Sequence, residues 1–267
     1  MIISHKHRYL FVELPRTGST AVRHELRELY DGEPILHKHA TYEEFVAIAS
    51  EDEKRYFVFS SIRNPLDDAV SRYFKFRTDH KQRYTDPARR PKHKPLVNRL
   101  LDDSAFRFVG RGRTEFGSFL RRYYPLPFAT WASLSHDRFD FVMRFERLAD
   151  DFAEALRRIG IEPLRPLPVA NQTGQRDRDF ASYYDAGAQR HARRVFGPYM
   201  RRWGYAFPAE WGLEPPTRWH ELQYAVVNSI GRLYWRHLRP RVVGRGRSRR
   251  RGATRPLPAA SAGTDDE

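Results

Sequence analysis

Short apolar runs alternate with amphipathic segments along most of the chain. Three runs are rich in aromatic and β-branched side chains, which is typical of buried strands. They cover residues 8–14 (RYLFVEL), 55–62 (RYFVFSSI) and 139–145 (FDFVMRF). A segment with helical spacing of apolar residues follows each run. Because strands that alternate with helices form parallel sheets, we predict an α/β protein with a central parallel sheet flanked by helices and a helical C-terminal part.

The helices are predicted from apolar spacing and from their end signals. Val22, Leu26 and Leu29 follow the first strand at i, i+4 and i+7. After the second strand, Asn64 can cap a helix and Pro65 suits its first position. Further helices are predicted to begin near residue 116 and to cover residues 148–159, 187–203 and 219–238.

Two segments depart from the alternation of strands and helices. Residues 75–122 hold 14 Lys and Arg against five acidic residues, a local net charge of +9, and three prolines break their first half. We interpret them as a basic elaboration within a single domain that covers residues 1–238. Residues 239–267 carry eight Arg among Gly, Pro and Ala, and we expect this tail to be disordered.

Composition narrows the classes of protein. The 267 residues carry a formal charge of +15 and no cysteine, which excludes a disulfide scaffold and thiolate chemistry. No apolar run approaches the ~18 residues of a membrane span. The N-terminal segment lacks the apolar core of a signal peptide. We therefore expect a cytoplasmic protein, with contact to the inner face of the membrane as an alternative.

The turn after the first strand carries candidate anion-binding groups. In residues 15–20, PRTGST, an arginine adds a fixed positive charge and three hydroxyls add donors, where a helix N-terminus offers free N–H groups. The turn is not a Walker A motif, because no Lys precedes its Ser or Thr. An ordinary strand-to-helix turn remains an alternative. The candidate residues are Arg16, Thr17, Gly18, Ser19 and Thr20.

A second candidate turn follows the second strand. Arg63 ends that strand at a helix start, and Ser71 lies two turns into the helix. Arginine suits the two-pronged binding of a tetrahedral oxyanion. The carboxyl ends of parallel strands share one edge of a sheet, so both turns should line one crevice. We therefore expect a ligand with two separated phosphates.

The two motifs, PRTGST and RNPLDDAVSRYF, resemble the nucleotide motifs of the PAPS-dependent sulfotransferases. PAPS is 3′-phosphoadenosine-5′-phosphosulfate. FDFVMRFERLADDF, LPVANQTG and YY…FGPYMRRWGY also resemble the carbohydrate branch of that family, so the resemblance spans residues 8–206. It implies a P-loop-kinase-like sulfotransferase fold and PAPS as co-substrate. It also implies that Arg63 and Ser71 contact the 3′-phosphate, and that Arg16, where many members have Lys, neutralises the leaving phosphate.

The segment LHKHATYEEF between the two motifs resembles the HGH-type segment of uronosyl 2-O-sulfotransferases. The resemblance implies that His39 is the general base for the acceptor hydroxyl, with His37 and Lys38 as neighbouring substrate contacts. Histidine is the usual base near neutral pH. A plain polar loop is the alternative interpretation. The scheme needs no metal, and no His, Asp and Glu cluster with metal-ligand spacing stands out.

The acceptor is expected to be a hydroxyl on an acidic glycan or glycolipid, because the basic elaboration at residues 75–122 could bind an acidic chain. A solvated basic face is an equal alternative interpretation of this segment. Arg147 is a weaker substrate candidate that could instead pair with Glu146. Asn171 and Thr173 are weaker candidates in the loop that would close over the nucleotide.

The C-terminal helix with its Arg-rich tail could contact a membrane. We favour packing of its apolar stripe on the domain itself.

Three rival functions remain. They are a nucleic-acid- or anion-binding protein, a small-molecule kinase with a degenerate phosphate loop, and an inactive sulfotransferase-like fold. No specific nucleic acid is expected, because the aromatic residues lie mostly on apolar stripes.

Overall fold

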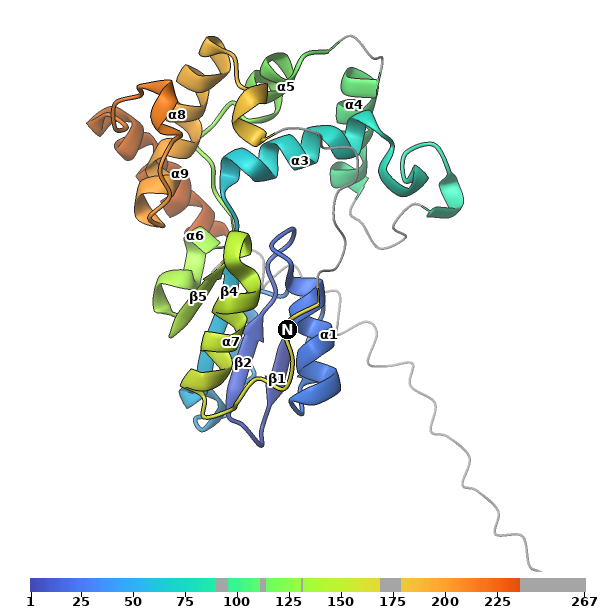
Figure 1. Ribbon diagram of the computed structural model, residues 1–267, viewed down its shortest axis with the longest axis vertical. Coiled ribbons are helices and arrows are strands. Elements are labelled where there is room, and N and C mark those ends of the chain that lie inside the picture. The colour runs from blue at the N-terminus through green and yellow to red at the C-terminus, as the bar shows by residue number, and fades with distance from the viewer. Residues whose placement is uncertain (90–95, 111–113, 131, 169–178, 236–267) are drawn as a thin grey trace, which may run out of the picture.

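The computed structural model describes residues 1–89, 96–110, 114–130, 132–168 and 179–235 (Figure 1). In this part of the chain the protein is an α/β structure in which helices flank a five-stranded mixed sheet of order β3-β1-β2-β4-β5. The strands are β1 (Ile2–Ser4), β2 (Tyr9–Val12), β3 (Glu33–Pro34), β4 (Phe57–Ile62) and β5 (Phe141–Arg144). The predicted α/β class is confirmed.

The sheet is parallel only over the three strands that the sequence predicted. β2 pairs with β4 and β4 with β5, both in parallel. β1 is antiparallel to β2 and to β3, so the predicted parallel sheet is confirmed for β2, β4 and β5 and is mixed at one edge. Only a few residues join β1 to β2, and so short a connection allows an antiparallel pair but not a parallel one.

Alternate side chains of the strands build a core on each face of the sheet. Phe11 and Phe59 face the layer formed by α1 (Ser19–Leu29) and α7 (Leu148–Arg158). Leu10 and Val58 face the opposite layer, which includes the short helix α2 (Tyr42–Val46). Both faces are therefore covered by described segments, which favours the ends of the strands as the place for a ligand.

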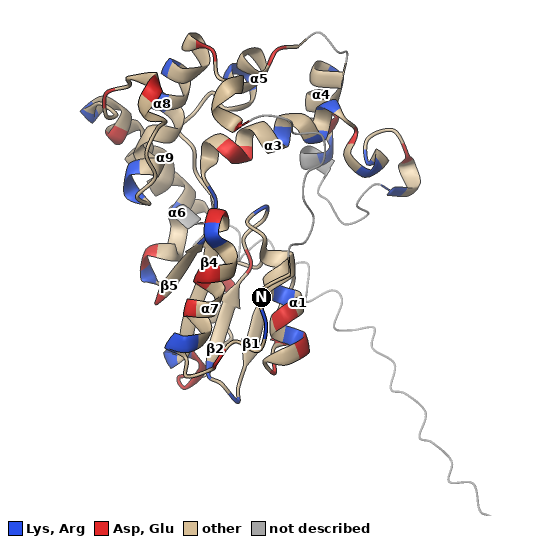
Figure 2. Ribbon diagram, in the orientation of Figure 1, with Lys and Arg blue, Asp and Glu red and all other residues tan. Residues whose placement is uncertain are grey.

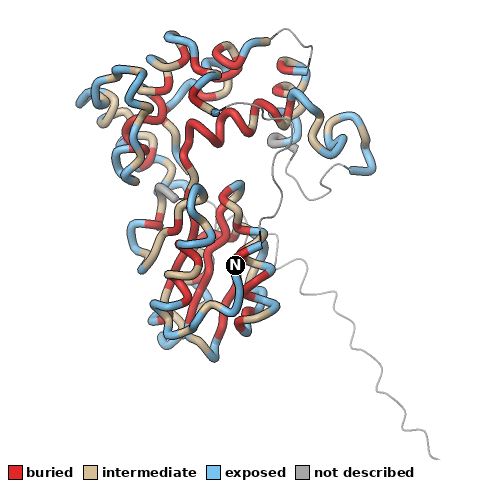
Figure 3. The backbone as a smooth tube through the Cα atoms, viewed as in Figure 1, coloured by how far each residue is buried: buried red, intermediate tan, exposed pale blue. Residues whose placement is uncertain are grey.

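A second layer of helices extends from the carboxyl end of β4 (Figure 1). Its core is formed by α3, α4, α5 and α8, and Figure 3 shows α3 buried along most of its length. The predicted basic elaboration belongs to this layer. The helices beyond the sheet layers are α3 (Pro65–Arg77), α4 (Leu96–Gly110), α5 (Phe116–Tyr123), α6 (Ala132–Ser135), α8 (Ala186–Arg202) and α9 (Arg218–Leu233).

The prediction that the apolar stripe of the last helix packs on its own domain is wrong. The buried residues of α9 are Tyr224 and Asn228. Trp219 and Leu222 lie on its exposed side, 62% and 53% accessible. The expected tail at 239–267 lies outside the described residues. Among those residues, no helix is long and apolar enough to cross a membrane.

Candidate functional site at the carboxyl ends of the parallel strands

The turn after β2 is held in a shape that needs glycine. Gly18 has φ 74° and precedes the first residue of α1. A Cβ atom at Gly18 would lie 2.3 Å from a methyl carbon of Leu148. Arg16 also lies in the left-handed region, at φ 66°. The turn thus folds tightly against the start of α7.

The buried hydroxyls of the turn hold its backbone. Thr17 and Ser19 both donate to the carbonyl oxygen of Leu14, at 2.9 Å each, and the Thr17 hydroxyl also lies 2.7 Å from that of Ser61. These two predicted anion donors therefore stabilise the loop. The hydroxyl of Thr20, whose oxygen accepts from Lys38, and the backbone N–H groups at the start of α1 remain as donors of this turn for an anion.

The start of α1 has no side-chain cap and no acidic residue in its first turn, a combination that α5 shares among the described helices. In α2, α3, α8 and α9, by contrast, the N-cap side chain accepts a hydrogen bond from the first turn. The positive end of the α1 dipole is therefore not offset by its own side chains.

Both predicted phosphate-binding arginines pair with carboxylates in the first turn of α3, drawn in red at that helix start in Figure 2. Arg16 binds Asp68 through two hydrogen bonds of 2.7 and 2.9 Å. Arg63 binds Asp67 at 2.6–2.7 Å. Burial opposes ionisation of Asp68, but the guanidinium groups of Arg16, Arg63 and Arg72, with Arg16 contributing most, together hold the pKa of this carboxyl below its usual range.

The two turns lie side by side, as predicted. Arg63 donates from Nη1 to the carbonyl oxygen of Arg16 at 3.3 Å, and its guanidinium lies 4.3 Å from the centre of the Phe145 ring. Ser71 is fully buried in α3. Contact between Ser71 and a bound phosphate would therefore require the start of α3 to rearrange.

A cavity of about 520 Å³ opens beside both turns. Arg16, Thr17 and Arg63 line one side of it together with Asp68 and Arg72. Aromatic residues also line the cavity, and among them the side chain of Tyr124 is buried. The aromatic lining consists of Tyr123, Tyr124, Phe128, Tyr199 and Trp235. Cations beside aromatic rings suit a ligand that carries both anionic and ring groups.

Arg72 is a cavity residue that sequence reasoning missed. It lies in RNPLDDAVSRYF one position after Ser71, and its long side chain reaches the cavity from α3. Asp67 and Asp68 lie in the same motif, and sequence reasoning also missed them as the partners of Arg63 and Arg16. The i, i+4 spacing of Arg63 and Asp67 was the signal that could have revealed one of these pairs.

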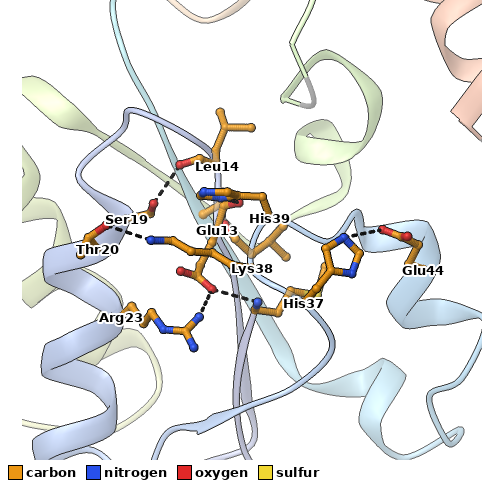
Figure 4. Close-up of polar contacts among 12 residues, drawn as sticks. Glu13, Leu14, Ser19, Thr20, Arg23, His37, Lys38, His39 and Glu44 are labelled. Carbon is orange, nitrogen blue, oxygen red and sulfur yellow. Dashed lines mark hydrogen bonds and ion pairs between the residues drawn. The ribbon is translucent and has the colours of Figure 1, made fainter. Parts of the chain in front are cut away.

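The segment at 37–39 lies against the turn after β2 (Figure 4). Lys38 donates from Nζ to the hydroxyl of Thr20 at 3.2 Å. His39 lies 3.0 Å from the carbonyl oxygen of Glu13 through Nδ1. Since a carbonyl only accepts, Nδ1 carries the proton and the lone pair lies on Nε2. Burial lowers the pKa of His39, so the ring is neutral at pH 7.

The other predicted contacts lie farther from the cavity. His39 does not line it. His37 is exposed and lies 3.9 Å from Glu44. Arg147, 64% accessible, pairs with Asp151 at 3.1 Å. The alternative interpretation, in which Arg147 pairs with Glu146, is therefore wrong, because its partner is Asp151.

Glu146 instead ties three elements together at this end of the sheet. It accepts hydrogen bonds from the backbone N–H of Asn64 at 2.7 Å and from the hydroxyl of Tyr205 at 3.0 Å. Asn171 and Thr173 lie outside the described residues.

The structure defines an α/β protein with a mixed five-stranded sheet and a cation-lined cavity at the carboxyl ends of its parallel strands. Comparison with protein-family models, with curated proteins and with solved structures finds no match for this chain.

Proposed function

We propose that the protein is a PAPS-dependent sulfotransferase with a P-loop-kinase-like sulfotransferase fold. The observation that carries the proposal is the pair of strand-to-helix turns that bring Arg16 and Arg63 to one cavity of about 520 Å³. Each turn resembles a nucleotide motif of that family, and their spatial contact is what a ligand with two phosphates requires. The uncapped start of α1, which belongs to the Arg16 turn, offers free N–H groups to the same ligand.

The residues of the two turns have different roles in this proposal. PAPS, when bound, supplies an activated sulfuryl group on a phosphate leaving group. Arg63 holds the 3′-phosphate, and Arg16 with the α1 N–H groups stabilises the charge that grows on the leaving oxygen. Each arginine exchanges its carboxylate partner for phosphate as the ligand enters, since both are oxyanions of similar hydrogen-bonding geometry.

His39 accepts the proton of the acceptor hydroxyl in this proposal. Its protonated Nδ1 is fixed by the Glu13 carbonyl, which leaves Nε2 as the basic atom. Because His39 lies beside the turn but outside the cavity lining, the acceptor must approach over the segment at 37–39. The acceptor is a hydroxyl on an acidic glycan or glycolipid, and the enzyme acts in the cytoplasm.

Calorimetric titration with 3′-phosphoadenosine-5′-phosphate tests the proposal. We expect binding without metal, at least tenfold tighter than that of adenosine 5′-phosphate, which lacks the 3′-phosphate. Arg63→Ala should weaken the 3′-phosphate ligand about 30-fold, because a charge-assisted bidentate contact is lost. Arg157→Ala, an exposed arginine of α7, is the matched control.

A preference for ATP with Mg²⁺, or equal affinity with and without the 3′-phosphate, would reject the assignment in favour of a kinase or a general anion-binding protein. If the nucleotide binds, His39→Ala separates binding from turnover. It should keep the nucleotide affinity and abolish transfer of labelled sulfate from PAPS to a glycan acceptor. Full transfer activity in that variant would assign the base elsewhere.

A further inference from the structure

The helix α9 carries a continuous apolar stripe that faces away from the protein. Five large side chains contribute, and each is between 49% and 62% accessible. They are Trp219, Leu222, Val226, Ile230 and Leu233. Single exposed apolar residues are common on protein surfaces, but five in one row along 16 residues are not.

The direction of the stripe follows from helix geometry. At about 100° per residue, the five side chains fall within an arc of about 80°. Tyr224 and Asn228 lie on the opposite side and are buried. The helix thus uses one face to pack on the domain, and no described segment of the chain covers its second, apolar face.

Positive charge accompanies the stripe. Arg218 and Arg232 are both exposed on α9. The one acidic residue of the helix, Glu221, forms an ion pair of 3.0 Å with Arg201. The sequence that follows α9 adds more charge, since residues 236–255 contain nine Arg and no acidic residue.

We propose that α9 docks on the surface of an anionic lipid bilayer, with its apolar stripe in the boundary between head groups and acyl chains. A helix of 16 residues is about 24 Å long and lies in this boundary when one face is apolar and its flanks are basic. Trp219 near the start and Tyr234 just after the end suit the two ends of such a helix, because amphipathic rings favour the head-group region.

Charge argues for a bilayer and against a second copy of the chain. In a two-fold contact the same surface meets itself, so Arg218 and Arg232 would approach their own copies or each other. Like charges that meet across an interface weaken it. Anionic lipid attracts the same residues, and each Lys or Arg near such a surface adds to the binding.

The opposite side of α9 and the residues just after it reach the candidate site. Asn228, Gly231 and Trp235 line the cavity of about 520 Å³. A docked α9 would therefore hold the cavity close to the lipid head groups. The docking itself does not depend on the proposed transfer reaction, and either one can fail without the other.

Co-sedimentation of the full chain with vesicles tests the docking. The probes are vesicles of phosphatidylcholine alone and of phosphatidylcholine with phosphatidylglycerol at 3:1, in 0.1 M salt. We expect binding to the anionic vesicles only. Ile230→Ser with Leu233→Ser should weaken it at least tenfold, because two side chains of the inserted stripe are lost. Leu164→Ser, 68% accessible and far from α9 in sequence, is the matched control and should bind as the wild type does.

Three results would overturn the proposal. The first is no binding of the wild type to anionic vesicles. The second is equal binding by the double variant, which would assign the interaction to basic residues alone. The third is a dimer in light scattering that the double variant abolishes, which would make the stripe an interface between copies. Circular dichroism and thermal unfolding of the double variant verify that exposed substitutions leave the fold unchanged.

Discussion

Asp68 competes with an anionic ligand for the same arginine. Its two hydrogen bonds to Arg16 occupy the guanidinium edge that would bind a phosphate. Asp68 is nearly buried, whereas the Arg16 side chain is one-third accessible. The arginine can therefore turn toward a ligand, while the carboxylate must give up its partner in a poorly hydrated place.

Substitution Asp68→Asn measures that competition. It should lower the free energy of unfolding by about 2 kcal/mol, because the Arg16 charge loses its partner. It should also raise the affinity for 3′-phosphoadenosine-5′-phosphate about tenfold, because Arg16 is released in advance. Urea unfolding and calorimetric titration give the two values. A weaker affinity would instead mean that Asp68 positions Arg16 for the ligand.

His136 is a buried histidine whose environment disfavours charge. Its Nε2 lies 2.7 Å from the hydroxyl oxygen of Ser60, which donates its own proton to the carbonyl of Val12. Nε2 is therefore the protonated atom, and Nδ1 is buried without a hydrogen-bond partner among the described residues. Burial lowers the pKa of His136 to about 3.

This pKa predicts acid sensitivity of the fold. Below about pH 6.5 this histidine is protonated in the unfolded chain but stays neutral in the folded chain. The free energy of unfolding therefore falls as the pH falls. Between pH 7 and pH 5 the loss from this one group should be about 2 kcal/mol. The variant His136→Gln should lack that part of the pH dependence in urea unfolding. Titration of the His136 ring by NMR above pH 5 would contradict the assignment, whether or not the variant folds.

Single residues also mark the limit of prediction for the site. The sequence identified Arg16 and Arg63 and the turns that bring them together. It did not reveal that the hydroxyls of Thr17 and Ser19 donate hydrogen bonds to the Leu14 carbonyl oxygen. Nor did it reveal that Asp68 binds Arg16. Residue type reveals which groups can donate, whereas the choice of partner depends on packing between segments 52 residues apart.

At the scale of elements, the β2–α1 turn depends on glycine for two reasons, a positive φ and the approach of Leu148. Gly160 has a similar φ of 78° but open space where a Cβ would lie. The two positions therefore separate backbone strain from steric contact.

We expect Gly160→Ala to cost about 1 kcal/mol of stability, from the left-handed backbone alone. Gly18→Ala should cost about 3 kcal/mol, because Leu148 must also move and the packing of α7 on the turn is loosened. Urea unfolding of both variants at one temperature provides the comparison. Equal losses would mean that the turn and α7 accommodate a methyl group freely.

The elements themselves were predictable where their signals were local. β2, β4 and β5 have runs of aromatic and β-branched residues, and α3 has its cap and proline. β1 and β3, with three and two residues, are too short for a periodic pattern, so the antiparallel edge was missed. The stripe of α9 has the spacing of a core helix, and periodicity alone does not reveal which of two faces is covered.

At the scale of the whole molecule, the described core ends well before the chain does. Tyr224 is the last residue of the buried apolar core among the described residues. Removal of residues 239–267 should therefore leave the melting temperature within about 2 °C of the full chain, as scanning calorimetry would measure. A large drop would mean that the tail packs on the domain. The same truncation should weaken binding to anionic vesicles, since eight Arg are lost.

The order of strands in the sheet has a consequence for biosynthesis. β4 pairs with β5, yet residues 63–140, which include α3, α4, α5 and α6, separate them along the chain. At translation rates of about 5–20 residues per second, β5 is synthesised about 4–16 s after β4. During that interval an inner strand behaves as an open edge with unpaired backbone groups. Ribosome-stalled chains that end before residue 141 should therefore recruit chaperones more strongly than chains in which α7 has emerged.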